Sequence, residues 1–353
     1  MEGLYVVVIT GYHGQKLRTI LKRIGYIDAL RGLTMILVVF SHIYIPNRTI
    51  VNQLFINFRM PLFFFISGLL SFRLAQEWTS AELRQRIATK ARTLLLPVLI
   101  FGTLYIYVGD VCSFKEMILT ERKMGYWFTL VLFEMLGIYY LLRYFVARSK
   151  REISIPRAIM WLFVIAVGLS FLWSERWLTA PLPTSICLSC LIRFMPFFCG
   201  GLLAGCHRET FDRIIDRRGI YLTAIVLFGL LSWGRMKLDG GIDIIICLLV
   251  GFAGIVMLYG TFRRMRTRLE DSTLVGRTMQ YVGRHTLEVY VIHYFLLLGI
   301  TDIFYPYVAA VAFPLSPLVV GLPIAITTAG LSLGIGWLLC RNRHIAYYAL
   351  GKR

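Results

Sequence analysis

Ten stretches of apolar residues, each long enough to cross a bilayer as a helix, run through this chain of 353 residues. A membrane-spanning helix needs about 20 such residues, and every backbone polar group inside the hydrocarbon must be paired within the chain. The composition, 58% hydrophobic and 16% charged, excludes an ordinary soluble domain. The sequence therefore predicts an all-α polytopic membrane protein with spans near 27–46, 54–72, 94–111, 127–146, 158–174, 185–206, 220–236, 242–262, 285–305 and 317–340.

The basic residues support ten spans and an orientation. Of the 38 Lys and Arg residues, 28 lie in or at the borders of the termini and the even-numbered loops, 7 lie in or at the borders of the odd-numbered loops, and 3 lie deeper within spans. The positive-inside rule then places both termini in the cytoplasm of a cell that carries this protein in its plasma or inner membrane. We expect residues 1–25 to form a cytoplasmic lead-in, 26–340 one membrane domain and 341–353 a basic cytoplasmic tail.

The net charge of +19 does not indicate a nucleic-acid partner. The basic residues punctuate apolar segments, which is how loops fix membrane topology, and they form no separate basic domain. The partner that this pattern predicts is the lipid bilayer.

Two ionisable residues of the first expected span point to a function. Arg31 and His42 are eleven positions apart, so on a helix they share one face and lie about 16 Å apart along the axis. A cation and an imidazole inside a membrane helix are costly and mark a functional site. Asp28, three residues before Arg31, offers a structural alternative in which the two side chains only pair.

Further ionisable residues lie at depth in other expected spans. Arg59 is expected near the depth of His42, although a snorkelling arginine is the alternative. Arg193 is expected to pair with Glu134 or Glu288, and a purely structural polar network is equally open. Together with His293, these residues suggest a polar cavity for an anionic ligand and for acid–base chemistry. No Cys or carboxylate lies at ligand spacing from either histidine, so no metal is expected.

Four sequence stretches resemble the membrane-bound acyltransferase-3 family of integral O-acyltransferases, and within it the fucose 4-O-acetylase and polysaccharide O-acetylase-like group. The match runs in order through residues 26–340. The stretches are Tyr26–His42 with its Arg-x10-His spacing, Phe58–Gly68, Trp127–Phe133, and Tyr281–Gly283 followed by Leu287–His293.

The resemblance implies acyl transfer, usually of acetyl from acetyl-CoA, to a hydroxyl of a carbohydrate or glycolipid such as a surface polysaccharide or its lipid-linked precursor. It implies His42 and Arg31 as essential residues. Some relatives carry an Arg-x-x-Arg pair after the second helix, which Arg84, Arg86, Lys90 and Arg92 do not reproduce. We expect catalytic roles for His42, Arg31 and Arg59, donor binding by Arg31, Lys90, Arg92 and Arg193, and acceptor binding by Trp127, Glu134, Tyr290 and His293.

Two other functions fit the same composition. A transporter of a sugar or lipid-linked glycan would also have about ten spans and buried arginines, but inverted repeats and matching pairs of broken helices are not apparent. A non-catalytic scaffold would leave the buried arginines and histidines costly and unused. The acyl group, the acceptor and a homo-oligomeric state stay open.

Overall fold

The computed structural model describes residues 5–6, 21–22, 24–43, 50–72, 78–149, 154–174, 183–237, 244–298 and 316–351. Most of the predicted lead-in, 1–25, lies outside these residues. A two-residue strand, β1 (Tyr5–Val6), pairs antiparallel with β2 (Leu21–Lys22). The rest of the described secondary structure is helical.

Each of the ten predicted spans coincides with a described helix. These helices are α1 (Gly25–His42), α2 (Ile50–Ser71), α3 (Ser80–Val108), α5 (Trp127–Arg148), α6 (Ile155–Ser174), α7 (Leu188–Cys206), α9 (Arg218–Lys237), α10 (Ile244–Arg264), α12 (Thr286–Leu297) and α14 (Ser316–Cys340). Shorter helices connect them: α4 (Phe114–Leu119), η1 (Lys123–Gly125), α8 (Arg208–Asp216), η2 (Arg266–Leu269), α11 (Leu274–Arg284) and α15 (Arg343–Leu350).

Seven of the described helices, α2, α3, α5, α6, α7, α10 and α14, are long and apolar enough to cross a membrane. Their outward faces carry large apolar side chains, such as Trp161 on α6, which is 65% exposed. Such surfaces suit lipid and not water. The prediction of a helical multi-span membrane protein is therefore confirmed.

Two predicted spans differ in their bounds. Helix α3 begins 14 residues before the predicted 94–111, because Thr79 and Glu82 form a reciprocal capping box at its N-terminus. Helix α12 is only 12 residues long and ends at Leu297, whereas the predicted segment runs to 305. Residues 299–305 lie outside the described part of the chain.

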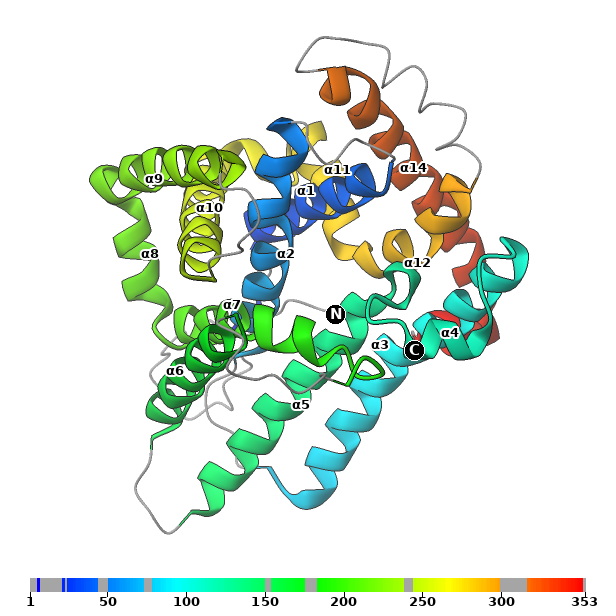
Figure 1. The fold of residues 1–353 in the computed structure, drawn as a ribbon, viewed down its shortest axis with the longest axis horizontal. Helices are drawn as coiled ribbons and strands as arrows, with labels where there is room; N and C mark the ends of the chain where they lie inside the picture. The colour runs from blue at the N-terminus through cyan, green and yellow to red at the C-terminus, as the bar shows by residue number, and fades with distance from the viewer. Residues whose placement is uncertain are drawn as a thin grey trace, which may run out of the picture.

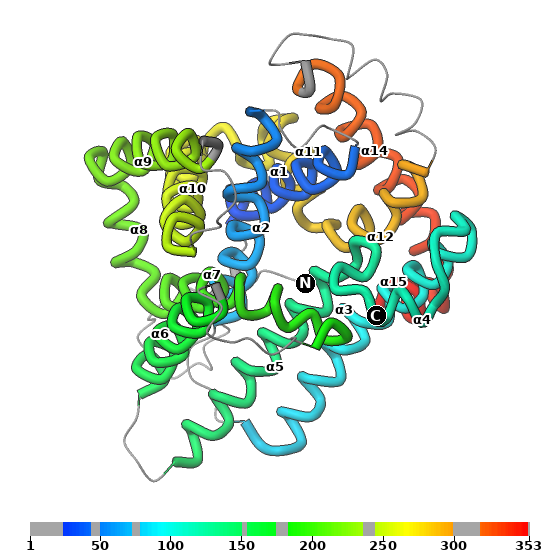
Figure 2. Tube along the Cα trace, in the orientation of Figure 1, coloured from blue at the N-terminus to red at the C-terminus, as the bar shows by residue number. Residues whose placement is uncertain are grey.

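Helix α1 lies at the centre of the helical assembly, between α2, α10, α11, α12 and α14 (Figure 1). Helices α3 and α5 pack side by side as a long antiparallel pair, and α2 packs along α7. The trace in Figure 2 shows α8 linking α7 to the α9–α10 pair at one side of the molecule. Fourteen residues of α1, from Tyr26 to Phe40, are buried.

Glycines allow the backbones of α1 and α11 to touch. A Cβ atom on Gly32 would overlap the carbonyl oxygen of Met279, and one on Gly283 would overlap that of Asp28. Small residues at such positions are the usual device for close helix packing in membranes, where apolar surface alone drives no association. The approach holds the Asp28–Arg31 turn of α1 firmly against α11.

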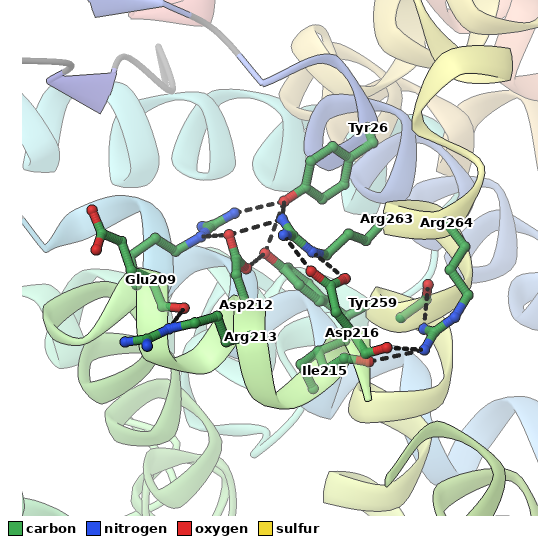
Figure 3. Close-up of polar contacts among 11 residues, drawn as sticks. Tyr26, Glu209, Asp212, Arg213, Ile215, Asp216, Tyr259, Arg263 and Arg264 are labelled. Carbon is green, nitrogen blue, oxygen red and sulfur yellow. Dashed lines mark hydrogen bonds and ion pairs between the residues drawn. The ribbon is translucent and has the colours of Figure 1, made fainter. Parts of the chain in front are cut away.

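A polar network ties α8 and α10 to the start of α1 (Figure 3). Asp212 on α8 accepts hydrogen bonds from Arg208 (3.0 Å), Arg263 (2.9 Å) and the Tyr259 hydroxyl (2.8 Å). The hydroxyl of Tyr26 on α1 lies 3.0 Å from that of Tyr259 and accepts a 2.8 Å hydrogen bond from Arg208. One carboxylate is thus shared by two guanidiniums where three helices meet.

The same arginine, Arg263, also binds Asp216 through two hydrogen bonds of 2.7 and 2.8 Å. This two-pronged geometry is the strong form of an arginine–carboxylate pair, and it lowers the pKa of Asp216 below its ordinary value. Arg264 donates to the carbonyl of Ile215 at 3.0 Å. The end of α8 is therefore fixed to the end of α10.

Replacing Gly283 with Ala tests the α1–α11 contact. The added Cβ meets the backbone of Asp28, which cannot move as a flexible side chain would, so we expect a loss of about 1–3 kcal/mol in stability. The readout is the thermal unfolding temperature of the purified protein in detergent. Gly330→Ala on α14, where the Cβ enters open space, is the matched control. Equal unfolding temperatures for the two variants would contradict the contact.

Candidate active site

A cavity of about 1020 Å³ lies at the end of α1 that carries His42. Residues from α1, α2, α5, α7 and α12 line it, together with the loop that precedes α5. We call this end of the bundle the His42 end. Five residues predicted for the site meet in its wall: His42, Arg59, Trp127, Arg193 and Tyr290.

His42 contacts two residues of α12. Its Nε2 atom lies 3.1 Å from the hydroxyl oxygen of Tyr294, and its ring centroid lies 5.3 Å from that of His293. His293 is fully buried, and its Nδ1–H donates to the carbonyl of Val289 at 2.9 Å. His42 is half-buried and lines the cavity. Of the two imidazoles, the one on α1 is the group that a bound molecule meets.

The loop before α5 is held against α12 by tyrosine hydroxyls. Tyr290 donates to the carbonyl of Gly125 at 2.8 Å and accepts the N–H of Phe128 at 3.2 Å. Gly125 has φ of +99°, and a Cβ there would overlap the Tyr294 hydroxyl. Only glycine fits both requirements, the backbone conformation and the space for the hydroxyl beside His42.

Lys123 also holds the loop before α5 in place. Its buried ammonium donates to the carbonyl oxygens of Ile118, of Thr120 (3.0 Å) and of Thr184 (2.9 Å). Burial lowers the pKa of Lys123, and the three carbonyls satisfy its three donors. Lys123 and Met124 have φ of +46° and +50°, conformations that non-glycine residues adopt rarely and that cluster at functional sites.

The charge of the cavity wall is strongly positive. Arg59, Arg122, Arg193 and Arg235 all line it, whereas Glu121 is the one acidic side chain among the described lining residues. The Nη1 atom of Arg59 is buried and has no hydrogen-bond partner within the described part of the chain. Such a wall attracts an anion or a developing negative charge.

Arg31 lies at the other end of α1 and is only 4% exposed. Its Nη2 donates to the hydroxyl of Thr286 on α12 at 3.1 Å, and its Nη1 lies 3.6 Å from the carboxylate of Asp28. The pairing with Asp28 is therefore present, as the spacing predicted. It is not the whole environment of Arg31, which also faces the start of α12.

A second, small apolar pocket lies beside α1, next to Met35 and Val38, which come between Arg31 and His42 in the sequence. It has a volume of about 30 Å³, and Thr286, the partner of Arg31, lies in its wall. Four of its lining residues also line the large cavity: Val38, Met60, Phe128 and Tyr290. The apolar pocket and the cavity around His42 therefore share part of one wall.

Four other predicted site residues do not line the cavity. Glu134 and His293 pack behind its wall, and the Glu134 Oε2 atom is buried. Arg92 on α3 donates to the hydroxyl of Tyr347 on α15 at 2.9 Å. Leu94 lines the apolar pocket, and Lys90, one turn earlier on α3, lies on the same helix face.

The predicted pairing of Arg193 with Glu134 or Glu288 does not occur among the described residues. Glu288 lies 2.7 Å from Nδ1 of His285, the residue that precedes α12, and the buried Oε2 atom of Glu134 has no hydrogen-bond partner there. His285 and Glu288 meet because residues three positions apart lie on one face of a helical turn. The described contact of Arg193 is the ring of Phe194, with its guanidinium carbon 5.9 Å from the centroid.

Three functional candidates were not predicted from the sequence: Tyr294, Arg122 and Arg235. Tyr294 directly follows His293, and a Tyr beside a buried His is a weak signal for a hydrogen-bond partner. Arg122 and Arg235 resemble ordinary loop cations, and only the packing of η1 and α9 around the cavity brings them to His42.

Comparison with known proteins gives one match. A family model described as an acyltransferase domain, Acyl_transf_3, matches residues 24–340. This match spans helices α1 to α14, and therefore both Arg31 and His42 and all the walls of the cavity. The curated proteins and the solved structures give no match.

Chemical labelling tests which imidazole is accessible. Diethyl pyrocarbonate acylates neutral, accessible histidines, so we expect it to modify His42 in the native protein and to leave His293, fully buried, unmodified. Mass spectrometry of peptides after a short reaction is the measurement, with exposed His344 as the internal reference. Modification of His293 at the rate of His344 would contradict the assignment.

Proposed function

Since this chain belongs to the membrane acyltransferase-3 family, we propose that it transfers an acyl group, acetyl in the first instance, from acyl-coenzyme A to a carbohydrate hydroxyl. The observation that carries this proposal is the cavity that His42 and Arg59 line, which shares four wall residues with a small apolar pocket that reaches Thr286, the partner of Arg31. A thioester on a long thin arm and a bulky sugar need sites of two different shapes. The open cavity suits the sugar, and in the proposed geometry the arm of the donor approaches His42 along the side of α1 that carries the apolar pocket.

The donor occupies the Arg31 end. Helix rise places Arg31 and His42 about 16 Å apart, a length that suits an extended pantetheine arm. In this proposal Arg31 and Lys90 bind the polar and phosphate groups of the coenzyme. Arg31 contacts Thr286, Lys90 lies one turn from Leu94, and both Thr286 and Leu94 line the apolar pocket. Arg92 lies two residues from Leu94 and adds to this basic rim.

His42 acts on the acceptor hydroxyl. The hydroxyl takes the place of the Tyr294 oxygen at Nε2, and His42 removes its proton as the oxygen attacks the thioester carbonyl. Arg59, which lines the same cavity, faces the negative charge that develops on the carbonyl oxygen. The C–S bond then breaks and the proton from His42 passes to the departing thiolate. The alternative is a transient acyl group on His42 itself.

Topology gives the two substrates their sides of the membrane. We propose ten spans, with α1, α9 and α12 completing the seven that are apolar enough alone, and both termini in the cytoplasm of a cell's plasma or inner membrane. Acetyl-CoA then enters from the cytoplasm at the Arg31 end. The acceptor, a surface polysaccharide or its lipid-linked precursor, enters the cavity at the His42 end.

Replacing His42 with Ala removes the general base. We expect acetyl transfer to fall by about 10²–10⁴-fold, measured with radiolabelled acetyl-CoA and purified protein. His344→Ala, an exposed histidine on α15, is the matched control and keeps its activity. Thioester hydrolysis measured with and without acceptor separates direct attack from an acyl-enzyme. Transfer by His42→Ala at the wild-type rate would refute the general-base role.

Coenzyme binding separates an acyltransferase from a transporter. Free coenzyme A at 100 times its Kd should stabilise the wild-type protein by about 2.7 kcal/mol, seen as a raised unfolding temperature. Arg31→Gln should reduce this shift, whereas Arg268→Gln, an exposed arginine on η2, should not. A wild-type protein that coenzyme A fails to stabilise would favour transport of a sugar or lipid-linked glycan instead.

A further inference from the structure

We infer that the acceptor carries an anionic group, a carboxylate or a phosphate, and that Arg122 and Arg193 bind this group beside His42. The inference rests on the proposed function only in calling the ligand an acceptor. The anion site itself follows from the charge and the packing of the cavity wall.

Among the described residues, the arginines of the cavity lack the carboxylate partners that arginines have at α8 and α10. Arg208 and Arg263 bind Asp212 and Asp216 at 2.7–3.0 Å. The guanidiniums of Arg122 and Arg193, by contrast, make no hydrogen bond and no ion pair within the described part of the chain. Gathered like charges repel one another, and an anionic ligand relieves that repulsion.

Arg122 and Arg193 both line the cavity near Cys190. Each guanidinium lies within electrostatic range of the Cys190 thiol, which lines the cavity as well. Arg193 lies one turn after Cys190 on α7, and Arg122 lies at the exposed rim of the loop before α5. Arg59, within electrostatic range of Arg122, continues the positive wall toward His42.

Arg235, another arginine of the cavity wall, is oriented by a neutral partner, so its positive charge stays available to a ligand. Its guanidinium donates to the amide oxygen of Asn57, and the Asn57 amide donates to Ser232 at 3.0 Å. A neutral amide orients the guanidinium without cancelling its charge, whereas a carboxylate would cancel it. Glu121, the acidic lining residue, is partly exposed, where water screens its charge.

An aromatic ladder beside these arginines suits a sugar ring. Phe64 stacks on Phe194 with centroids 5.2 Å apart, and Phe194 stacks on Trp127 at 5.5 Å. Trp127 presents this ladder to the cavity next to Arg193. A flat apolar surface beside two guanidiniums matches a ligand with an apolar ring face and a nearby anion, which is an acidic or phosphorylated sugar.

The phosphates of the coenzyme are a poor match for the same arginines. In the proposed geometry they lie at the Arg31 end, about 16 Å from His42 along α1. The apolar pocket beside α1 has a volume of only about 30 Å³, too small for a nucleotide. The anion at the His42 end therefore belongs to the other substrate.

The test is a binding titration followed by thermal unfolding, with glucuronic acid, glucose 1-phosphate and neutral glucose as probes in uncharged detergent. We expect at least one anionic probe to stabilise the wild-type protein more strongly than glucose does. Arg193→Gln and Arg122→Gln should each weaken its binding by about 10–100-fold, the range for a lost hydrogen bond to a charged group. Lys115→Gln, which removes an exposed cation of α4 outside the cavity wall, should leave binding unchanged.

Repeating the titration with saturating coenzyme A assigns the site. Binding of the anion alongside coenzyme A supports an acceptor site, and the preferred probe identifies carboxylate or phosphate. Displacement by coenzyme A, equal binding of glucose, or equal binding to all three variants would overturn the inference. The proposed function is tested separately, by measuring whether cleavage of acetyl-CoA depends on His42. If the wild-type protein cleaves acetyl-CoA through His42 but the anionic probes do not bind as expected, only the inference of an anionic acceptor is refuted.

Discussion

The backbone contact between α1 and α11 is the constraint on which the site depends. Gly32 and Gly283 let the two helices approach until carbonyl oxygens occupy the space of a side chain. Helix α1 is thereby buried on nearly every side and cannot roll about its axis. Because Arg31 and His42 share that helix, fixing its rotation directs both side chains toward α12, where Thr286 and Tyr294 receive them.

The arginines occur in two environments: some are paired with carboxylates between helices, and others face the cavity without a carboxylate partner among the described residues. Where helices need to be joined, as at α8 and α10, carboxylates neutralise the guanidiniums through short hydrogen bonds. At the proposed ligand site, the guanidiniums face a cavity and are oriented by an amide or an aromatic ring. Removing charges from water is expensive unless they are paired. Arg193 and Arg59 have no carboxylate partner within the described residues, which in the proposed site leaves their charge available to a ligand.

Much of the fold follows from the sequence, because membrane helices obey local rules. Apolar length alone located all ten helices, and the eleven-residue spacing predicted that Arg31 and His42 share a face. The extra length of α3 depends on one capping box at Thr79, which apolar length cannot reveal. The partners of the site depend on tertiary packing: Tyr294 becomes a partner of His42 only because α12 runs along α1 from Arg31 toward His42. The left-handed turn at Lys123 and Met124 is likewise held in part by the carbonyl of Thr184, which is distant in sequence.

The apolar pocket beside Val38 and Tyr290 bears on ion leakage along α1. Its volume of about 30 Å³ holds at most a water or two, and apolar side chains form most of its wall. An ion or a hydrated proton would lose its solvent shell there, at a cost of many kcal/mol. The apolar packing beside α1 therefore opposes the movement of ions from the charged cavity at the His42 end toward the Arg31 end.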